Sequence, residues 1–386
     1  MQYKYSILLL KNNLTTFDGY KNAIMSTAKH NWTKDEIIAI YNKPLMDLLF
    51  EAASIHRKSH DPNVVQVSTL LSIKTGGCPE DCGYCPQAAR YHTEIEGNDL
   101  MSVSQVKAQA LRAKSSGSSR VCMGAAWRNV KDGPEFDQVL EMVRTINKLD
   151  MEVCCTLGMI TENQAHRLAE AGLYAYNHNL DTSEEYYKEV ISTRGFEDRL
   201  QTIENVRKTN VTVCSGGIIG MGESIEDRAG MLVALSTLNP QPESVPINAL
   251  VAVEGTPLEE EKPVEIWEMI RMVATTRIIM PETQVRLSAG RMNMSREGQA
   301  MCFFAGANSI FAGDKLLTTP NPDVNEDMKM FETLGLVAQK PFIKIMQPTT
   351  VEAVDSQFQA LGEKPKWSRP GHTIEKNLEA SGKGNA

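Results

Sequence analysis

Residues 67–85 read Val67-Ser-Thr-Leu-Leu-Ser-Ile73-Lys-Thr-Gly-Gly-Cys78-Pro-Glu-Asp-Cys82-Gly-Tyr-Cys85. The β-branched start predicts a strand, and the two glycines predict the beginning of a flexible loop. Three thiolates on one short loop can hold three irons of a cubane 4Fe–4S cluster, which leaves the fourth iron open to a small molecule. A zinc knuckle is the alternative, and it requires a fourth ligand such as His92.

The alternation of strand and helix that begins here continues along the chain. Short β-branched runs predict eight strands, at 67–73, 120–123, 152–157, 173–179, 211–214, 245–250, 284–287 and 308–311. Helical periodicity fills the gaps, at 103–114, 134–149, 162–171, 197–209, 225–238, 263–279 and 295–305. Eight such units predict a TIM-type (β/α)8 barrel with the cysteine loop at its active-site face. A doubly wound open sheet is the alternative.

The two ends of the chain lack the pattern of the barrel, which we expect to span residues 30–337. Residues 1–29 are predicted to be a poorly ordered extension; a mitochondrial presequence is the alternative, but the stretch before Met25 contains no Arg. Thr33 and Glu36 form a capping-box pattern that predicts the first of two N-terminal helices, and the second covers about 44–56. Residues 338–386, rich in Pro, Lys, Glu, Ser and Gly, predict a disordered tail.

Composition excludes several classes of protein. The 386 residues are 42% hydrophobic and 23% charged, which is typical of a globular chain and not of a disordered or fibrous one. The net charge of −8 argues against nucleic-acid binding, and no apolar run reaches the roughly 18 residues of a membrane span. Clustered cysteines without a secretory signal indicate metal binding in a reducing compartment. We expect the cytoplasm, with the mitochondrial matrix as the alternative.

The cysteine spacing, with Tyr84 before the third cysteine, resembles that of the radical S-adenosylmethionine (SAM) enzymes. Within that superfamily the chain resembles the biotin synthase family over about residues 30–337. Eight strings carry the resemblance in the family's order: LLSIKTGGCPEDCGYCPQ, RVCMGAAWR, MEVCCTLGM, AYNHNLDTS, VCSGGIIGMGE, ESVPINAL, VRLSAGR and AGANSIFAGDKLLTTPNP.

The resemblance implies an enzyme that inserts sulfur into dethiobiotin to form biotin. An electron from reduced flavodoxin or ferredoxin enters a 4Fe–4S cluster held by Cys78, Cys82 and Cys85, and SAM is cleaved to a 5′-deoxyadenosyl radical. The sulfur comes from a 2Fe–2S cluster, and the family suggests a homodimer. Two alternatives are a radical SAM barrel enzyme with another substrate, and a structural zinc or iron–sulfur protein without catalysis.

Three further cysteines fall in three different predicted strands: Cys122, then Cys154 or Cys155, then Cys214. A single strand cysteine is usually a small buried apolar residue, but three of them can converge on a barrel lumen. Adjacent strand residues face opposite sides, so only one of the neighbouring pair faces inward, and periodicity does not choose between them. The resemblance implies Cys122, Cys154 and Cys214 as 2Fe–2S ligands, with Arg286 as the fourth. From the residues alone, a guanidinium without a lone pair indicates a buried ion pair instead.

The resemblance also implies a SAM site near the cysteine loop. Tyr84 matches an adenine contact, and Asn179 and Asp181, at the end of the fourth predicted strand, offer acceptors for the ribose hydroxyls. Arg199 matches the partner of the methionyl carboxylate, and Asn248 matches a substrate contact; by itself Asn248 is an ordinary strand-end amide. The string G-x-I-x-G-x-x-E after the fifth strand is a weak signal alone, because a simple turn has the same glycines; its cofactor-binding residues are Gly216, Gly220 and Glu223.

Overall fold

Eight parallel strands close into a barrel in this computed structural model, which describes residues 28–313, 315–341, 368–369 and 372–373. Each strand pairs with the next, and β9 pairs back to β1, which completes the ring. The strands of the ring are β1 (Val64–Lys74), β2 (Arg120–Ala125), β3 (Glu152–Thr156), β4 (Ala175–Asn177), β5 (Thr212–Cys214), β7 (Ser244–Ala249), β8 (Gln284–Leu287) and β9 (Ser309–Ala312). The predicted barrel is therefore confirmed, and the open sheet is wrong.

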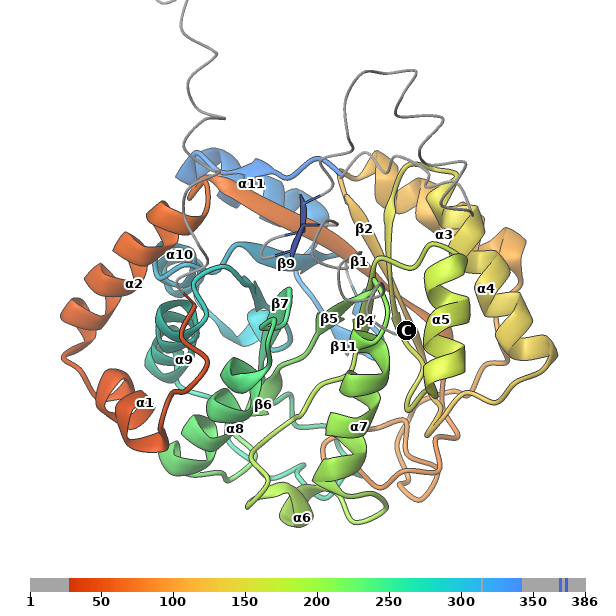
Figure 1. The fold of residues 1–386 in the computed structure, drawn as a ribbon, viewed down its shortest axis with the longest axis horizontal. Coiled ribbons are helices and arrows are strands. Elements are labelled where there is room, and N and C mark those ends of the chain that lie inside the picture. The colour runs from red at the N-terminus through yellow and green to blue at the C-terminus, as the bar shows by residue number, and fades with distance from the viewer. Residues whose placement is uncertain (1–27, 314, 342–367, 370–371, 374–386) are drawn as a thin grey trace, which may run out of the picture.

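Helices surround the strands as an outer ring (Figure 1). Their bounds are α1 (Lys34–Tyr41), α2 (Leu45–Ser59), α3 (Val103–Ser115), α4 (Pro134–Asn147), α5 (Glu162–Glu170), α6 (Tyr187–Val190), α7 (Phe196–Arg207), α8 (Ile225–Thr237), α9 (Ile266–Ile279), α10 (Arg296–Phe304) and α11 (Val324–Leu334), with a 3-10 turn at Arg291–Asn293. None of the helices in the described ranges is both long and apolar enough to cross a membrane.

The N-terminal helices form as the sequence predicts. Thr33 Oγ1 accepts a hydrogen bond from Glu36 N (3.2 Å), and a Glu36 carboxylate oxygen accepts one from Thr33 N (2.9 Å), which completes the capping box. Helix α1 then packs on α8 and α9, and α2 packs on α9. Residues 1–27 of the expected extension lie outside the described residues.

The sequence pattern did not predict helices α6 and α11 or the short strands outside the ring. β12 (Val337–Ala338) pairs with the start of β1, so β1 begins three residues before the expected Val67. β6 (Gly217–Ile219) pairs with β7, and β10 (Lys315–Leu316) pairs with β11 (Thr319–Pro320). Local periodicity cannot reveal such pairing, because it depends on neighbours distant in the chain. In the tail, 338–341 and the paired strands β13 (Ser368–Arg369) and β14 (His372–Thr373) are described, and the rest lies outside the described residues.

A buried group of charges lies where the ring strands begin. Arg120, the first residue of β2, donates to Glu152 at the start of β3 (2.8 Å) and to Glu243 just before β7 (2.9 Å). Its guanidinium also lies over the ring of Tyr174, 4.8 Å from the centroid. A buried cation between two carboxylates satisfies charges that would otherwise be costly to remove from water. These groups fill the end of the lumen opposite the cysteine loop.

We expect Gly158→Ala to destabilise the barrel strongly. Gly158 follows β3 with φ of 75°, and a methyl group there would overlap the carbonyl oxygens of Trp127 and Arg128. Backbone strain plus this clash predicts a loss of about 2–4 kcal/mol in the free energy of unfolding. The matched control is Gly117→Ala, because Gly117 has φ of 87° but no atom near the added methyl group; it should lose only about 1 kcal/mol. Urea unfolding checks both, and equal losses would contradict the role of the overlap.

Candidate active site

The three-cysteine loop follows β1 and folds back on itself through backbone hydrogen bonds. Cys85 N donates to Cys82 O (2.9 Å), Cys78 N donates to Gln87 O (3.0 Å), and Ala89 N donates to Cys78 O (2.7 Å). Burial raises the pKa of all three thiols, and that of Cys85 reaches about 12, with the neighbouring Cys82 adding to the effect. Burial outweighs the nearby arginines, so these thiols are held in the protonated form; bound iron would stabilise their thiolate form.

A segment between α6 and α7 clamps this loop. Gly83 N donates to Val190 O (2.9 Å), and the Asp81 carboxylate accepts from the backbone N–H groups of Ser192 (2.9 Å) and Thr193 (3.1 Å). Burial acts to raise the pKa of Asp81, but hydrogen bonds from Ser192 and Thr193 outweigh it and lower the pKa to about 2. Glu80 in the same loop is bonded to the Thr193 hydroxyl. Acidic residues between the cysteines thus fix the loop to the barrel.

Three of the residues matched to SAM binding meet at the end of β4. The Tyr84 hydroxyl donates to Asp181 Oδ2 (2.8 Å), and Arg199 forms a buried ion pair with the same carboxylate. Arg199 Nε also donates to the Tyr187 hydroxyl (2.9 Å). Asp181, four residues after the end of β4, has a positive φ of 70°. The structure therefore joins the cysteine loop, β4 and α7 in one polar network.

Asn179 belongs to a second set of contacts, which runs along β4 into the lumen. Its Oδ1 accepts from Gly216 N (3.2 Å) and from Asn177 Nδ2 (3.1 Å). The amide of Asn177 also lies 3.2 Å from the sulfur of Cys214. β4 ends at Asn177, and the chain continues through Asn179 to Asp181, so one short segment reaches from Cys214 to the Tyr84 network. Asn177 was not among the predicted site residues, although its spacing from Asn179 was a usable signal.

The glycine string after β5 is held by backbone packing and by its own glutamate. A side chain at Gly216 would overlap the carbonyl oxygen of Pro246 in β7, so only glycine fits beside that strand. The Glu223 carboxylate accepts from Gly220 N (2.9 Å) and Met221 N (2.7 Å), and it pairs with Arg228 (2.8 Å). In the structure the oxygens of Glu223 therefore face the backbone of its own turn.

Asn248, matched to a substrate contact, bridges three strand ends. Its Nδ2 donates to Gly217 O in β6 (2.9 Å), and its Oδ1 accepts from Ala289 N after β8 (3.2 Å). It is only partly buried. Its amide thus holds neighbouring strands together at the mouth of the barrel. This is the role expected of an ordinary amide side chain at a strand end.

The barrel interior receives three cysteines at one level. Strand register places Cys122 of β2 opposite Cys154 of β3, and both pack in an apolar cluster separate from the core between strands and helices. Their neighbour Cys155 belongs to that outer core. A hydrogen bond from Cys154 is the main cause that lowers the pKa of Cys214 to about 6, and the charge of Arg286 acts in the same direction. The sulfurs of Cys122, Cys154 and Cys214 therefore converge.

Arg286 lies beside these sulfurs without a carboxylate partner among the described residues. Its side chain is buried, with Nη1 3.8 Å from Cys214 Sγ. Nε donates to Ser309 Oγ (2.8 Å), and Nη2 donates to Gln66 Oε1 (2.8 Å). The face of the guanidinium lies over Phe311, 4.6 Å from the ring centroid. The buried ion pair that the residues alone suggested is therefore absent at this position in the described part of the chain.

The lumen fits an additional polar or charged group. Its walls carry buried side-chain atoms that find no hydrogen-bond partner among the described residues: Gln66 Nε2, Ser68 Oγ and Ser244 Oγ. Buried polar groups are rarely left unsatisfied in native proteins. No set of three or more His, Cys, Asp or Glu side chains in the described ranges surrounds a single-ion position. An iron–sulfur cluster does not require side chains that surround one ion, because its thiolate ligands bind more than one iron.

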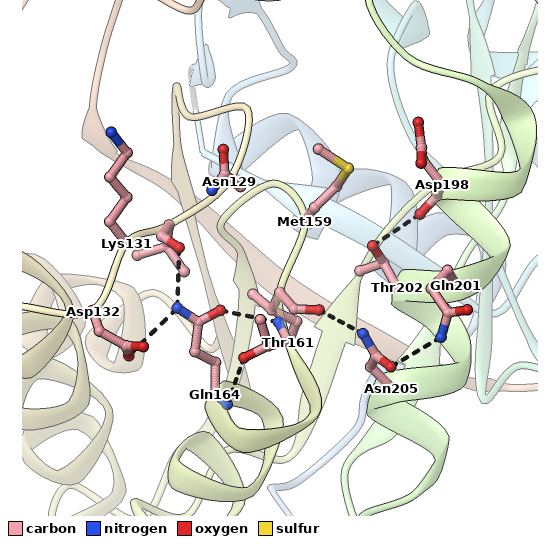
Figure 2. A pocket seen from close by; sticks show the side chains of 12 residues that line it. Asn129, Lys131, Asp132, Met159, Thr161, Gln164, Asp198, Gln201, Thr202 and Asn205 are labelled. Atoms are coloured by element: carbon pink, nitrogen blue, oxygen red, sulfur yellow. Dashed lines mark hydrogen bonds between the residues drawn. The ribbon is translucent and has the colours of Figure 1, made fainter.

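A pocket of about 560 Å³ lies outside this site, between the loops after β2 and β3 and helix α7 (Figure 2). Its polar side chains bond mainly to the local backbone and to one another. Gln164 Nε2 donates to Val130 O (3.0 Å), and Asn205 Nδ2 donates to Ile160 O (2.8 Å). None of the predicted site residues lines it. Its amides tie loops to helices, so we assign it a structural role.

Comparison with known proteins identifies two family domains in the chain. Residues 72–235 match the radical SAM superfamily, and residues 246–337 match the biotin and thiamin synthesis associated domain. The chain is 93% identical to biotin synthase of Flavobacterium johnsoniae over 355 residues, which cover 92% of this chain and 98% of that protein. It is 57% identical to the mitochondrial biotin synthase of Arabidopsis thaliana, over 83% of this chain and 85% of that protein.

Solved structures share the fold at low sequence identity. Methylornithine synthase superposes with a TM-score of 0.66 at 18% identity, covering 80% of this chain and 94% of that chain. The FeFe-hydrogenase maturase HydG from Carboxydothermus hydrogenoformans superposes with a TM-score of 0.68 at 15% identity, covering 80% and 76%. These likenesses support the barrel alone, and the much closer relatives decide the family. The chain belongs to the biotin synthase family, radical SAM sulfurtransferases that convert dethiobiotin into biotin.

Proposed function

We propose that this chain converts dethiobiotin into biotin with two different iron–sulfur clusters at opposite ends of one polar wall. The observation that carries the proposal is the sequence of contacts along β4. Asn177 reaches Cys214, Asn179 bonds to Asn177, and Asp181 bonds to Tyr84 of the cysteine loop. These contacts support two cluster sites that face the same lumen.

Cys78, Cys82 and Cys85 are the proposed ligands of a 4Fe–4S cluster. Their spacing and their common loop support the assignment, as do the raised thiol pKa values, because bound iron stabilises the thiolate form that burial disfavours. SAM is proposed to bind beside them, with Tyr84, Asp181 and Arg199 contacting its adenosine and methionyl parts. In the structure Arg199 and Asp181 satisfy each other, so SAM binding would exchange that pair for contacts with the ligand. Asn179, Gly216, Gly220 and Glu223 shape the wall next to it.

Cys122, Cys154, Cys214 and Arg286 are the proposed holders of a 2Fe–2S cluster. The converging sulfurs support this set, as does the guanidinium, which has no carboxylate partner in the described part of the chain. When bound, SAM and the clusters supply the hydrogen-abstracting radical and the sulfur atom. The chain contributes a water-poor lumen, closed at one end by Arg120 and its two glutamates, which protects reactive species from side reactions. Asn248 is proposed to contact dethiobiotin at the mouth.

Further proposals follow from family membership. A reduced flavodoxin or ferredoxin would supply electrons, and the chain would act as a homodimer in the cytoplasm. The catalytic unit would be residues 30–337, with residues 1–29 and 338–386 outside it.

An anaerobic iron and sulfide count with an absorbance spectrum tests the two-cluster proposal. We expect six irons per chain after reconstitution. Four irons would favour a radical SAM enzyme with a single cluster, and bound zinc would favour the structural alternative.

Replacing Cys82 with Ala should abolish SAM cleavage. Cys82 is the buried member of the loop, and a cubane cluster held by only two thiolates is expected to be labile. The measurement is 5′-deoxyadenosine formed per chain under anaerobic conditions. The matched control is Cys302→Ala, a buried thiol in helix α10, which should retain wild-type cleavage. Wild-type production by the Cys82→Ala protein would show that the first cluster is assigned to the wrong loop.

Replacing Cys154 should remove the second cluster, whereas replacing its neighbour Cys155 should not. Cys154 faces the lumen and Cys155 packs into the outer core. We therefore expect Cys154→Ala to keep four irons and lose biotin formation. Cys155→Ala should keep six irons and lose about 1 kcal/mol of stability. Iron content and biotin yield are compared after identical reconstitution; an inactive Cys155→Ala with active Cys154→Ala would reverse the ligand assignment.

A further inference from the structure

Arg194 lies in the segment between α6 and α7 and points toward the cysteine loop. Its side chain is only 7% exposed. Nη2 donates to the sulfur of Cys82 over 3.9 Å, and Nη1 lies 3.7 Å from Glu80 Oε1. Hydrogen bonds to sulfur are longer than those to oxygen, and this contact lies at the long end of their range. Arg194 thus brings a buried positive charge to one proposed cluster ligand.

The position of Arg194 is tied to that of the loop. The residues before it carry the clamp described above, in which Val190 accepts from Gly83 and Ser192 and Thr193 donate to Asp81. These contacts bracket Cys82 on both sides in the sequence. The guanidinium is therefore held by the same segment that holds the loop, and a flexible surface arginine would lack this constraint.

The other charged side chains near Cys82 are paired with one another, and Arg194 is the cation in contact with the sulfur of this cysteine. Glu80 is shared with Arg128, whose Nε lies 3.6 Å away. Arg199 is engaged by Asp181. Among the described residues, Nε of Arg194 has no hydrogen-bond partner, although it is buried. The charge of Arg194 is thus incompletely compensated by protein groups, and it faces the place where negative thiolates would be.

We propose that Arg194 is a positioning residue for the first cluster, and that its contact with Cys82 raises the potential at which this cluster accepts an electron. The inference rests on the proposed 4Fe–4S assignment. Donors and positive charge at a cluster sulfur stabilise the reduced form, which carries one more negative charge. The cluster takes one electron from an external reductant; Arg194 keeps its proton and neither forms nor breaks a covalent bond.

The test compares Arg194→Gln, Arg194→Lys and a control, Arg128→Gln, in the full chain after anaerobic reconstitution. Arg128 pairs with the same glutamate, but its side chain is 38% exposed and it contacts no cysteine sulfur in the described structure. The readout is the midpoint potential of the four-iron cluster, from dithionite titration followed by electron paramagnetic resonance. We expect a more negative midpoint for Arg194→Gln, an intermediate one for Arg194→Lys, and the wild-type midpoint for Arg128→Gln.

A full iron content with the wild-type midpoint in Arg194→Gln would overturn the inference. Loss of first-cluster iron in Arg194→Gln alone, with retention in the other two variants, would support it through the positioning role. Loss in all three variants would overturn it, because the arginines would then act only on the fold of the loop. Failure of the proposed function is distinguishable, since the wild-type protein itself would then lack a four-iron signal.

Discussion

The pairing of β1 with β9 is the constraint on which the site depends. It closes the barrel, and its register sets Gln66 opposite Ser309, which in turn lies opposite Arg286 of β8. Ser309 and Gln66 then form a closed set of hydrogen bonds with the guanidinium. A shift of one residue would turn each of these side chains away from the lumen. The closing seam of the barrel therefore also orients the arginine beside the sulfurs.

The interior is electrostatically unusual for a protein core. Arg286 is buried next to three thiols and finds only amide, hydroxyl and aromatic partners among the described residues. An isolated buried charge is costly, and several lumen polar atoms are also unsatisfied. Clusters with thiolate ligands would compensate both, because they bring negative sulfur and metal charge together. Cofactor binding and the stability of the barrel interior are thus expected to be coupled.

Much of the fold was predictable, because its units are local. The β8 bounds match the sequence pattern, and α8 and α10 differ by only a residue or so at their ends. The cysteine loop was equally visible from its spacing. Gln66 was missed because its place in β1 depends on pairing with Ser309 of β9, and the contacts of Ser192 and Thr193 with the cysteine loop were missed because a loop has no period. From the residues alone, alternation limited the inward-facing cysteine of β3 to Cys154 or Cys155. The family resemblance picked Cys154, and the packing of Cys154 apart from the outer core, to which Cys155 belongs, agrees with that choice.

The spacing of polar residues at the end of β4 and just after it relates the two proposed cluster sites to the size of the substrate. Residues 177 and 181 are four positions apart, which is at most about 13 Å in an extended chain. Asn177 touches Cys214 at one end, and Asp181 touches Tyr84 at the other. Under the proposed assignments, a gap of this size accommodates one small molecule between the SAM site and the second cluster site. One short segment, the end of β4 and the four residues after it, would therefore bring both proposed centres within reach of one substrate and still keep them apart from each other.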